Sequence, residues 1–422
     1  MNTKVLIWPG TGIIGSEVFD SLKCMKNIDL TLSTDSQDLS IIGKDINKIY
    51  IPNVSDKSTD WLHILSMISS NYDLIFPTND LVIDLIVNAE TISLEKYILS
   101  HRDTVKLCRS KKLSAQFFKD KIPVLEEVNL DAMEYPVYFK PDKGYGAKDH
   151  QIIFNKIELD LAMGKHPDSF ITELLVGNEY TVECFSDFNG DLIYSNPRIR
   201  ERIQFATSTK LVKPSIESTL ALEKYATIIN KEINLDGPWF FQMKEDSRGN
   251  LKLLEIGIRI PGSAVWSRAF GVNLAELAIY NKKHISTSVI CNKSELTIER
   301  NLQSKVHLKL DFNYVYIDFD NTIYVNDGVN EETFIFLNKC FYRGIKIILI
   351  TKYLGSDLSL KLETLRIKSL ISEVIHISES DSKYRYIENL DSIFIDDSFS
   401  ERQEVFNNLK INTYGPDIME LI

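Results

Sequence analysis

Two aspartates separated by one residue, Asp318 and Asp320, have the clearest chemical potential in this sequence. They follow the apolar run 314–317, which is typical of a buried strand. Two carboxylates this close at a strand end are costly to bury unless a cation or a proton shares the site. A first aspartate that attacks phosphorus and a second that handles the proton would use this arrangement for phosphoryl transfer.

Further polar side chains follow in the same region. One apolar run ends in Thr351, and another ends in Asp396 and Asp397. Lys383 lies between them in the sequence. With this order of motifs, residues 313–422 resemble the haloacid-dehalogenase-like phosphatases.

This resemblance implies a role for each residue. Asp318 would be the nucleophile and Asp320 the acid and base. Thr351 would hydrogen-bond the phosphoryl group, and Lys383 would offset the negative charge. The residues implied to bind Mg²⁺ are Asp318, Asp320, Asp396 and Asp397. The implied fold is Rossmann-like with little or no cap, because residues 322–344 are too few for a large helical cap. The alternative is a non-catalytic relic whose acids only bind a metal.

The composition limits the protein class. The chain has 422 residues, enough for two to four domains of roughly 100–200 residues. The net charge of −11 argues against a nucleic-acid partner held by bulk charge. No apolar run approaches the ~18 residues of a membrane helix, and the N-terminus lacks a signal-peptide pattern. The five cysteines are scattered without a CxxC motif, which indicates free thiols in a cytoplasmic protein without zinc.

The pattern of apolar residues changes twice along the chain. The first hundred residues alternate strand and helix signals, such as 4–8, 14–22 and 72–77, which predicts a parallel α/β layer. From about residue 104, closely spaced strands with short turns such as 187–191 predict antiparallel sheets. The α/β alternation restarts after about residue 311, with a helix predicted at 331–342.

A glycine cluster follows the first predicted strand. Gly10, Gly12 and Gly15 have the GxGxxG spacing, and Asp35 lies twenty residues beyond Gly15. This pattern suits a dinucleotide whose pyrophosphate lies at a helix N-terminus. The alternative is a glycine turn that packs the strand against the helix and lines a cleft without any dinucleotide.

The middle region combines a basic strand end with acidic strands. Lys140 ends a strand and is followed by the glycine-containing loop 143–148. A lysine held on a strand can neutralise a phosphate, and the loop can direct backbone N–H groups at the same ligand. Gln242 and Glu255 lie on two later strands, where paired oxygen ligands could bind Mg²⁺.

The order and spacing of these segments resemble the ATP-grasp superfamily over roughly residues 1–300. The resemblance implies a pre-ATP-grasp α/β domain at 1–105 and an ATP-grasp domain at 106–300, before the phosphatase-like domain at 313–422. The implied ATP contacts are Lys111, Lys140, Gly144, Tyr145, Gly146, Glu173, Leu174, Leu175 and Glu179. The implied Mg²⁺ ligands are Gln242 and Glu255. The arginines implied to stabilise phosphate charge are Arg198, Arg200 and Arg259.

One position departs from that pattern. Many members have Glu-x-Asn-x-Arg on the metal-binding strand, and here Gly257 replaces the asparagine between Glu255 and Arg259. One metal ligand is therefore in question. Similar versions occur in proteins that resemble amino-acid ligases, so the change does not by itself imply an inactive site.

The two resemblances together predict a bifunctional enzyme. ATP would phosphorylate a small-molecule carboxylate, and an amine would attack the acyl phosphate to give an amide and ADP. The C-terminal region would hydrolyse a phosphate ester, either the ligation product or another compound of the pathway. The alternatives are an NAD(P)-binding oxidoreductase that uses the glycine cluster, and a regulatory protein that binds nucleotide without turnover. The oligomeric state stays open, although dimers are common among ATP-grasp ligases.

Overall fold

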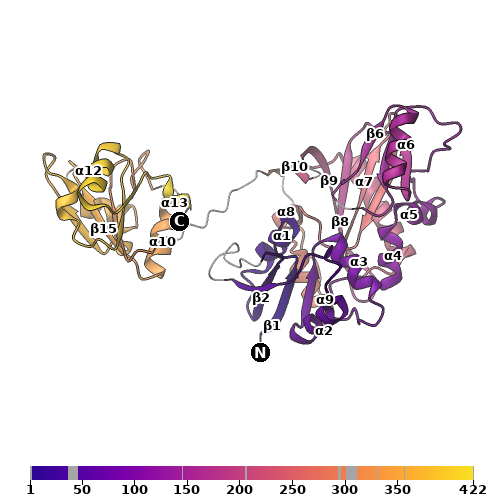
Figure 1. Cartoon of the computed structure of the whole chain (residues 1–422), viewed down its shortest axis with the longest axis horizontal. Coiled ribbons are helices and arrows are strands. Elements are labelled where there is room, and N and C mark those ends of the chain that lie inside the picture. The colour runs from indigo at the N-terminus through magenta and orange to yellow at the C-terminus, as the bar shows by residue number, and fades with distance from the viewer. Residues whose placement is uncertain are drawn as a thin grey trace. The chain divides into compact units, whose positions relative to one another are not determined.

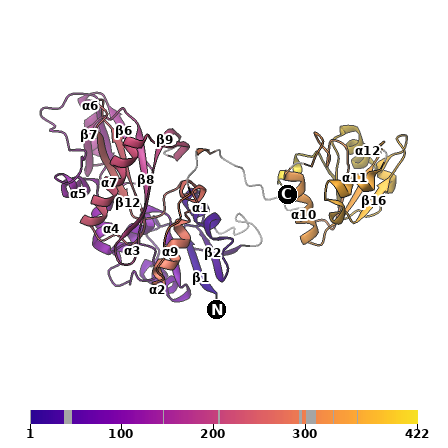
Figure 2. The same cartoon turned by 180° about the vertical axis from the view of Figure 1, so that it is seen from behind.

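The protein consists of two compact units, Met1–Leu302 and Gln303–Ile422. The computed structural model (Figures 1 and 2) describes residues 2–36, 46–144, 146–204, 207–292, 296–300, 311–329, 331–355 and 357–421. Each unit has its own sheets and its own hydrophobic clusters. Among the described helices, none has both the length and the apolar character that crossing a membrane requires.

A parallel sheet opens the first unit, in the strand order β3-β2-β1-β4. Its strands are β1 (Thr3–Trp8), β2 (Ile28–Thr34), β3 (Asn47–Tyr50) and β4 (Leu74–Pro77). The helices that follow them are α1 (Ile13–Leu22), α2 (Trp61–Asn71) and α3 (Asp80–Asn88). Leu6 packs with the cluster that holds α2 and α3, whereas Val5 and Ile7 pack with α1. Both sheet faces are therefore covered, as expected for parallel strands, and the predicted α/β layer is confirmed, with β3 and α2 as additional elements.

Close packing explains two glycines of the GxGxxG cluster. A Cβ atom on Gly15 would lie 2.5 Å from the carbonyl oxygen of Gly10 and 2.6 Å from that of Pro9. A Cβ atom on Gly10 would lie 2.6 Å from Cβ of Leu32 on the neighbouring strand. These distances leave no room for a side chain, so strand–helix packing accounts for both residues without any ligand.

A small antiparallel sheet follows, in the order β6-β5-β7. The chain reaches it through α4 (Arg102–Arg109) and α5 (Lys111–Phe118). Its elements are β5 (Val137–Pro141), β6 (Gln151–Ile153), α6 (Lys156–Lys165) and β7 (Ser169–Glu173). Leu159 and Ala162 of α6 pack with Val137 and Phe139 of β5, so the helix lies beside the sheet (Figure 2).

A larger antiparallel sheet completes the first unit, in the order β12-β11-β8-β9-β10-β13. Its strands are β8 (Glu179–Ser186), β9 (Leu192–Gln204), β10 (Thr207–Val212), β11 (Gly237–Glu245), β12 (Leu251–Gly257) and β13 (Thr297–Glu299). Its helices are α7 (Ile216–Glu232), α8 (Val265–Ala269) and α9 (Leu274–Lys282). Leu222 and Ile229 of α7 pack with Val182 and Phe241 of the sheet. The predicted antiparallel character of the middle region is confirmed.

The second unit contains a parallel sheet in the order β16-β15-β14-β17-β18. Its strands are β14 (Tyr314–Ile317), β15 (Lys346–Thr351), β16 (Glu373–His376), β17 (Ser392–Ile395) and β18 (Asn412–Tyr414). Its helices are α10 (Glu331–Tyr342), α11 (Leu358–Thr364), α12 (Phe399–Leu409) and α13 (Ile418–Leu421), with 3₁₀ turns η2 (Lys368–Leu370) and η3 (Lys383–Tyr386). Phe336 of α10 packs on one face with Val315, and Val405 of α12 packs on the other with Tyr316 (Figure 1).

The edge strands β16 and β18 are the elements of this sheet that sequence patterns missed. Both are short, and most of their residues are exposed or half-buried, so they lack a long apolar run. The connection from β14 to α10 contains two isolated bridges, Asp320 with Tyr324 and Val325 with Gly328. Its described residues, 318–329, form no helix.

The contacts of Gly15 predict a stability difference between two helical glycines. Gly15→Ala should lower the free energy of unfolding by about 1–3 kcal/mol, because the new methyl group meets backbone oxygens. Gly164→Ala in α6 is the matched control. Among the described residues, nothing lies within 4 Å of a Cβ atom at this position. The substitution should therefore be neutral or stabilising by up to about 1 kcal/mol.

Urea unfolding followed by tryptophan fluorescence would measure this difference. All four tryptophans (Trp8, Trp61, Trp239 and Trp266) belong to the first unit, so the signal reports that unit alone. Equal stability of the two variants would contradict the packing argument.

Candidate functional sites

A cavity of about 580 Å³ lies in the first unit, where the loop after β1 approaches strands of both antiparallel sheets. The side chains and glycines that line it come from segments far apart in the sequence. The predicted site residues among them are Lys111, Lys140, Gly144, Gly146, Glu179, Arg198, Arg200, Gln242, Glu255 and Arg259. Folding therefore brings these residues to one space. Their individual roles stay predictions.

Two buried lysines form the basic side of this cavity. Lys140 is the next-to-last residue of β5 and is 3% exposed, and Lys111 begins α5 and is 6% exposed. Lys111 Nζ donates to the carbonyl oxygen of Asp142 at 3.1 Å, and Lys140 Nζ donates to that of Leu254 at 3.5 Å. Burial, followed by the neighbouring Lys111, lowers the pKa of Lys140 to about 7. An anion bound in the cavity would offset the repulsion between the two lysine ammonium groups.

The predicted phosphate-covering loop borders the same space. Gly144 and Gly146 line the cavity, and Gly146 has a φ of +57°, which glycine adopts without strain. Tyr145, predicted to belong to this loop, lies outside the described residues.

The predicted metal ligands lie opposite each other on paired strands. Gln242 of β11 is the register partner of Glu255 of β12. With its amide oriented to suit both neighbours, the Gln242 nitrogen donates to Glu255 Oε1 at 3.2 Å. The Gln242 oxygen then accepts from Arg200 Nη1 at 3.1 Å. Arg200 also forms an ion pair with Glu179. In this orientation the amide oxygen faces Arg200, so a cation bound by Glu255 and Gln242 together would require the opposite amide orientation, with the oxygen toward Glu255.

The structure explains why position 257 lacks a side chain. A Cβ atom on Gly257 would lie 2.3 Å from two ring carbons of Phe240, its register partner on β11. The Phe240 ring thus fills the place where an asparagine would project. Arg259 packs its guanidinium 5.1 Å from the centre of the same ring.

Like Arg200, the predicted arginines Arg259 and Arg198 have acidic partners. Arg259 donates to both carboxylate oxygens of Asp80, at 3.0 and 3.1 Å. Arg198 is buried and its Nε donates to the buried Glu183 at 3.0 Å. Burial raises the pKa of Glu183 and lowers that of Arg198. Sequence patterns missed Asp80, because it lies 179 residues before Arg259 and carries no local motif.

The predicted adenine-binding segment lies elsewhere. Glu173, Leu174 and Leu175 are not among the described residues that line the cavity. Glu173 ends β7 and is exposed, whereas Leu175 is buried in the hydrophobic core. Their contact with a nucleotide stays a prediction.

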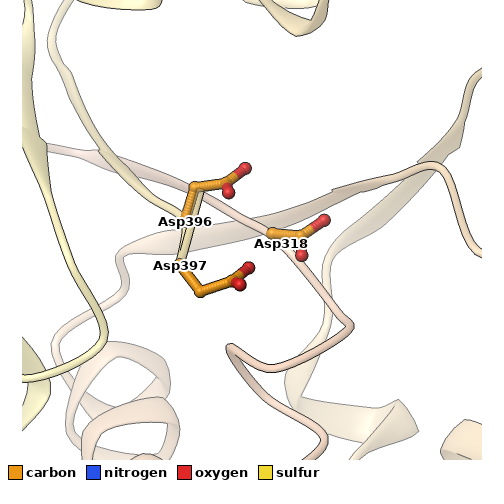
Figure 3. Close-up of side chains that lie close together, drawn as sticks. All are labelled: Asp318, Asp396 and Asp397. Carbon is orange, nitrogen blue, oxygen red and sulfur yellow. The ribbon is translucent and has the colours of Figure 1, made fainter. Parts of the chain in front are cut away.

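A second cluster of chemical groups lies in the second unit, at the carboxyl ends of two adjacent parallel strands. Asp318 follows β14, and Asp396 and Asp397 follow β17 (Figure 3). Ligand atoms of all three lie within 4.8 Å of one another, and Figure 3 shows their carboxylates turned to the same side. Carboxylate oxygens at this spacing suit a hard cation such as Mg²⁺.

Lys383 bridges two of these aspartates. Its Nζ donates to Asp318 Oδ1 and to Asp396 Oδ2, each at 2.6 Å. Burial raises the pKa of Asp318 to about 7, although Lys383 opposes the shift. Burial also opposes charge on Lys383, but Asp318 and Asp396 together raise its pKa. Both acids are therefore held by one cation in a nearly dry site.

The other predicted residues of this unit lie around the cluster. Burial, with Asp397 nearby, raises the pKa of Asp320. Thr351 ends β15 fully buried, and its hydroxyl accepts from the backbone N–H of Tyr353 at 3.1 Å. Sequence reasoning assigned no role to the Thr322 side chain, whose hydroxyl accepts from the backbone N–H of Asp397 at 3.0 Å and so links the two strand ends.

Comparisons with known proteins bear on the first unit. Residues 165–303 match a family model described as ATP-grasp in the biosynthetic pathway with Ter operon. The biotin carboxylase domain of Hydrogenobacter thermophilus 2-oxoglutarate carboxylase, solved with MgADP, ADP and bicarbonate, is similar with a TM-score of 0.57 and 17% identity. That similarity covers 69% of this chain and 72% of the other. No curated protein matches the sequence.

Two further solved structures are similar over comparable lengths. An L-amino acid ligase from Bacillus licheniformis has a TM-score of 0.53 at 17% identity, covering 67% of this chain and 74% of its own. N5-carboxyaminoimidazole ribonucleotide synthetase from Thermotoga maritima has a TM-score of 0.53 at 15% identity, covering 70% and 78%. The first unit has an ATP-grasp fold. In this ATP-grasp unit, the cavity lies between the α/β layer and the two antiparallel sheets.

The buried pairings of Lys383 predict a large, pH-dependent effect of its removal. Lys383→Met should lower the stability of the second unit by about 3–5 kcal/mol at pH 7, because two buried carboxylates lose their cation. The loss should shrink as the pH falls towards 5. Both acids have raised pKa values in the folded state, so protonation at lower pH favours that state.

Far-UV circular dichroism during urea unfolding would measure this change. The second unit has no tryptophan, so its transition is the one that leaves tryptophan fluorescence unaltered. Lys352→Met is the control, since Lys352 forms a less buried pair with Glu401 at 2.6 Å and should cost about 1 kcal/mol or less. A loss of stability that does not depend on pH would contradict the electrostatic explanation.

Proposed function

We propose that the first unit joins a carboxylate to an amine by way of an acyl phosphate, using ATP and Mg²⁺ and releasing ADP. The observation that carries the proposal is the cavity itself. Two buried lysines, two glycines of one loop and the Gln242–Glu255 pair all line it. Basic groups for phosphates and oxygen ligands for a cation are what phosphoryl transfer from ATP requires.

Each part of the cavity would contribute one step. Lys111 and Lys140 would bind phosphate oxygens, and the anion would restore the charge that burial disfavours on Lys140. The loop around Gly144 and Gly146 would exclude water from the reactive acyl phosphate. Arg259, held by Asp80, would face the charge that develops on the transferred phosphoryl group.

The metal donor set is small but chemically suitable. Glu255 offers a carboxylate and Gln242 an amide oxygen, and both are hard ligands. Mg²⁺ held there would neutralise phosphate charge, with phosphate oxygens completing its coordination. Gly257 supplies no third ligand, because the Phe240 ring occupies that position.

The similar structures support this choice of chemistry. One was solved with MgADP and bicarbonate, and another is an amino acid ligase. Carboxylates and amines are therefore the substrate classes to test first. The identities of the two substrates are left to the experiment.

A screen for ADP release with Mg-ATP and pooled carboxylates and amines would test the ligase. ADP should appear only with a productive pair and fall at least about a hundredfold in Glu255→Gln, which loses the carboxylate ligand. Glu217→Gln, at an exposed residue of α7, makes the same change in charge and should retain full activity. Nucleotide binding without ADP release from any pool would instead favour a regulatory protein, and NAD(H) binding would favour the oxidoreductase alternative.

We propose that the second unit hydrolyses a phosphate monoester. The observation that favours this second activity is the buried Lys383 that bridges Asp318 and Asp396 beside Asp397. Asp318 would attack phosphorus, and the alcohol would leave with a proton from Asp320. Asp320 would then remove a proton from the water that hydrolyses the aspartyl phosphate. Mg²⁺ held by Asp318, Asp396 and Asp397 would favour the ionised form of Asp318.

Hydrolysis of p-nitrophenyl phosphate by the intact chain would test this activity. Asp318→Asn should lower the rate at least about a thousandfold, because it removes the nucleophile. Removing Mg²⁺ with a chelator should also abolish turnover. Asp391→Asn, an exposed aspartate before the opposite end of β17, should leave the rate unchanged. Full activity of Asp318→Asn would disprove the assignment.

A further inference from the structure

We infer that the ATP-grasp cavity contains a second oxyanion site, formed by Arg198, Arg300 and the N-terminus of α1. This inference rests on the proposed ligation and defines its substrate class. One of the two substrates carries a phosphate or carboxylate group besides the groups that react.

Two guanidinium nitrogens are the first evidence. Arg198 and Arg300 both line the cavity, and the Nη1 atom of each is buried without a hydrogen-bond partner in the part of the chain that the structure describes. Arg198 is fixed on its other side, since Nε donates to Glu183 and Nη2 donates to Ser263 Oγ at 2.5 Å. A buried donor without a partner is costly, and an oxyanion would satisfy both arginines.

The N-terminus of α1 is the second evidence. Gly12, Ile13 and Ile14 line the same cavity, and the N-cap Gly12 makes no side-chain cap. The first backbone N–H groups of a helix lack intrahelical acceptors and carry the positive end of its dipole. They therefore add donors for an anion.

Ser263 and Gly262 connect Arg198 to the N-terminus of α1. Ser263 accepts the hydrogen bond from Arg198, and its neighbour Gly262 lies against the first turn of α1. A Cβ atom on Gly262 would lie 3.4 Å from Ile14 and 3.6 Å from Ile13. The residue next to the hydrogen-bond partner of Arg198 therefore lies close to the first turn of α1.

The nearby acids are already neutralised. Glu183 is paired with Arg198, and Glu17 of α1 accepts from Arg268 at 2.6 Å. Asp80 is bound by Arg259. Glu179 is paired with Arg200, and Glu255 is the carboxylate of the proposed Mg²⁺ site, so the acids that line the cavity each have a cation or an assigned role. Planar guanidinium groups and backbone N–H groups suit both phosphate and carboxylate, so this shared chemistry defines the ligand.

Titration calorimetry on the intact chain would test the site. Methyl phosphate and acetate are the two probes, each added with Mg²⁺ and a saturating non-hydrolysable ATP analogue that fills the nucleotide site. Arg300→Gln should weaken binding of the preferred probe about tenfold or more, the loss expected for a charged hydrogen bond. The stronger probe in the intact protein shows whether the handle is phosphate or carboxylate. Binding at the second unit is the same in all variants and cancels in the comparison.

Two further variants make the test specific. Ile13→Glu puts a carboxylate at the first residue of α1, where it suits the helix dipole but should repel the probe. Arg202→Gln is the charge-matched control, because Arg202 is half exposed and does not line the cavity. The site is expected to lose affinity in the first two variants and to keep it in the control. Unchanged binding in Arg300→Gln, or an equal loss in Arg202→Gln, would overturn the inference.

The oxyanion site and the ligase activity can be rejected independently of each other. Probe binding that depends on Arg300, with no ADP from any pool, would keep the oxyanion site and reject the ligase. ADP release that does not distinguish substrates with an anionic handle from neutral analogues, with the same KM in Arg300→Gln, would keep the ligase and reject the site.

Discussion

Charge buried away from water is the constraint on which both units depend. In the first unit, Lys111 and Lys140 lie close together with carbonyl oxygens as their hydrogen-bond acceptors, and the pKa of Lys140 falls to about 7. In the second, Asp318 and Asp396 share one lysine. Neither arrangement lowers the free energy of folding by much, since desolvation offsets the attraction. A bound ligand of opposite charge would stabilise each arrangement.

The two clusters are complementary in sign. Lysines and arginines outnumber carboxylates around the cavity of the first unit, whereas the second unit gathers carboxylates around Lys383. Phosphate is a ligand that each could use, directly in the first case and through a metal ion in the second. A substrate whose phosphate serves as a handle in ligation would be a natural substrate for the second unit. A compound used by both units would explain why the two activities occur in one chain.

Sequence patterns were most informative where a short segment contains both an apolar strand run and the functional residue at its end. Lys140 at a strand end and Asp318 after four apolar residues are of this kind, because a buried strand leaves a distinct apolar run. The helix predicted at 331–342 matches α10. The edge strands β16 and β18 were missed, since exposed edges need no apolar pattern.

The sequence by itself therefore determined the order of α/β and antiparallel layers and most of the charged groups at their strand ends. Only the tertiary structure decided which of these groups meet. The pairing of Asp80 with Arg259 and the Phe240 ring over Gly257 each join separate elements. Among the described residues, the fold also leaves Nη1 of Arg198 and of Arg300 without a hydrogen-bond partner. Local periodicity records whether a side chain is buried, whereas the partner of a buried charge depends on how separate elements pack.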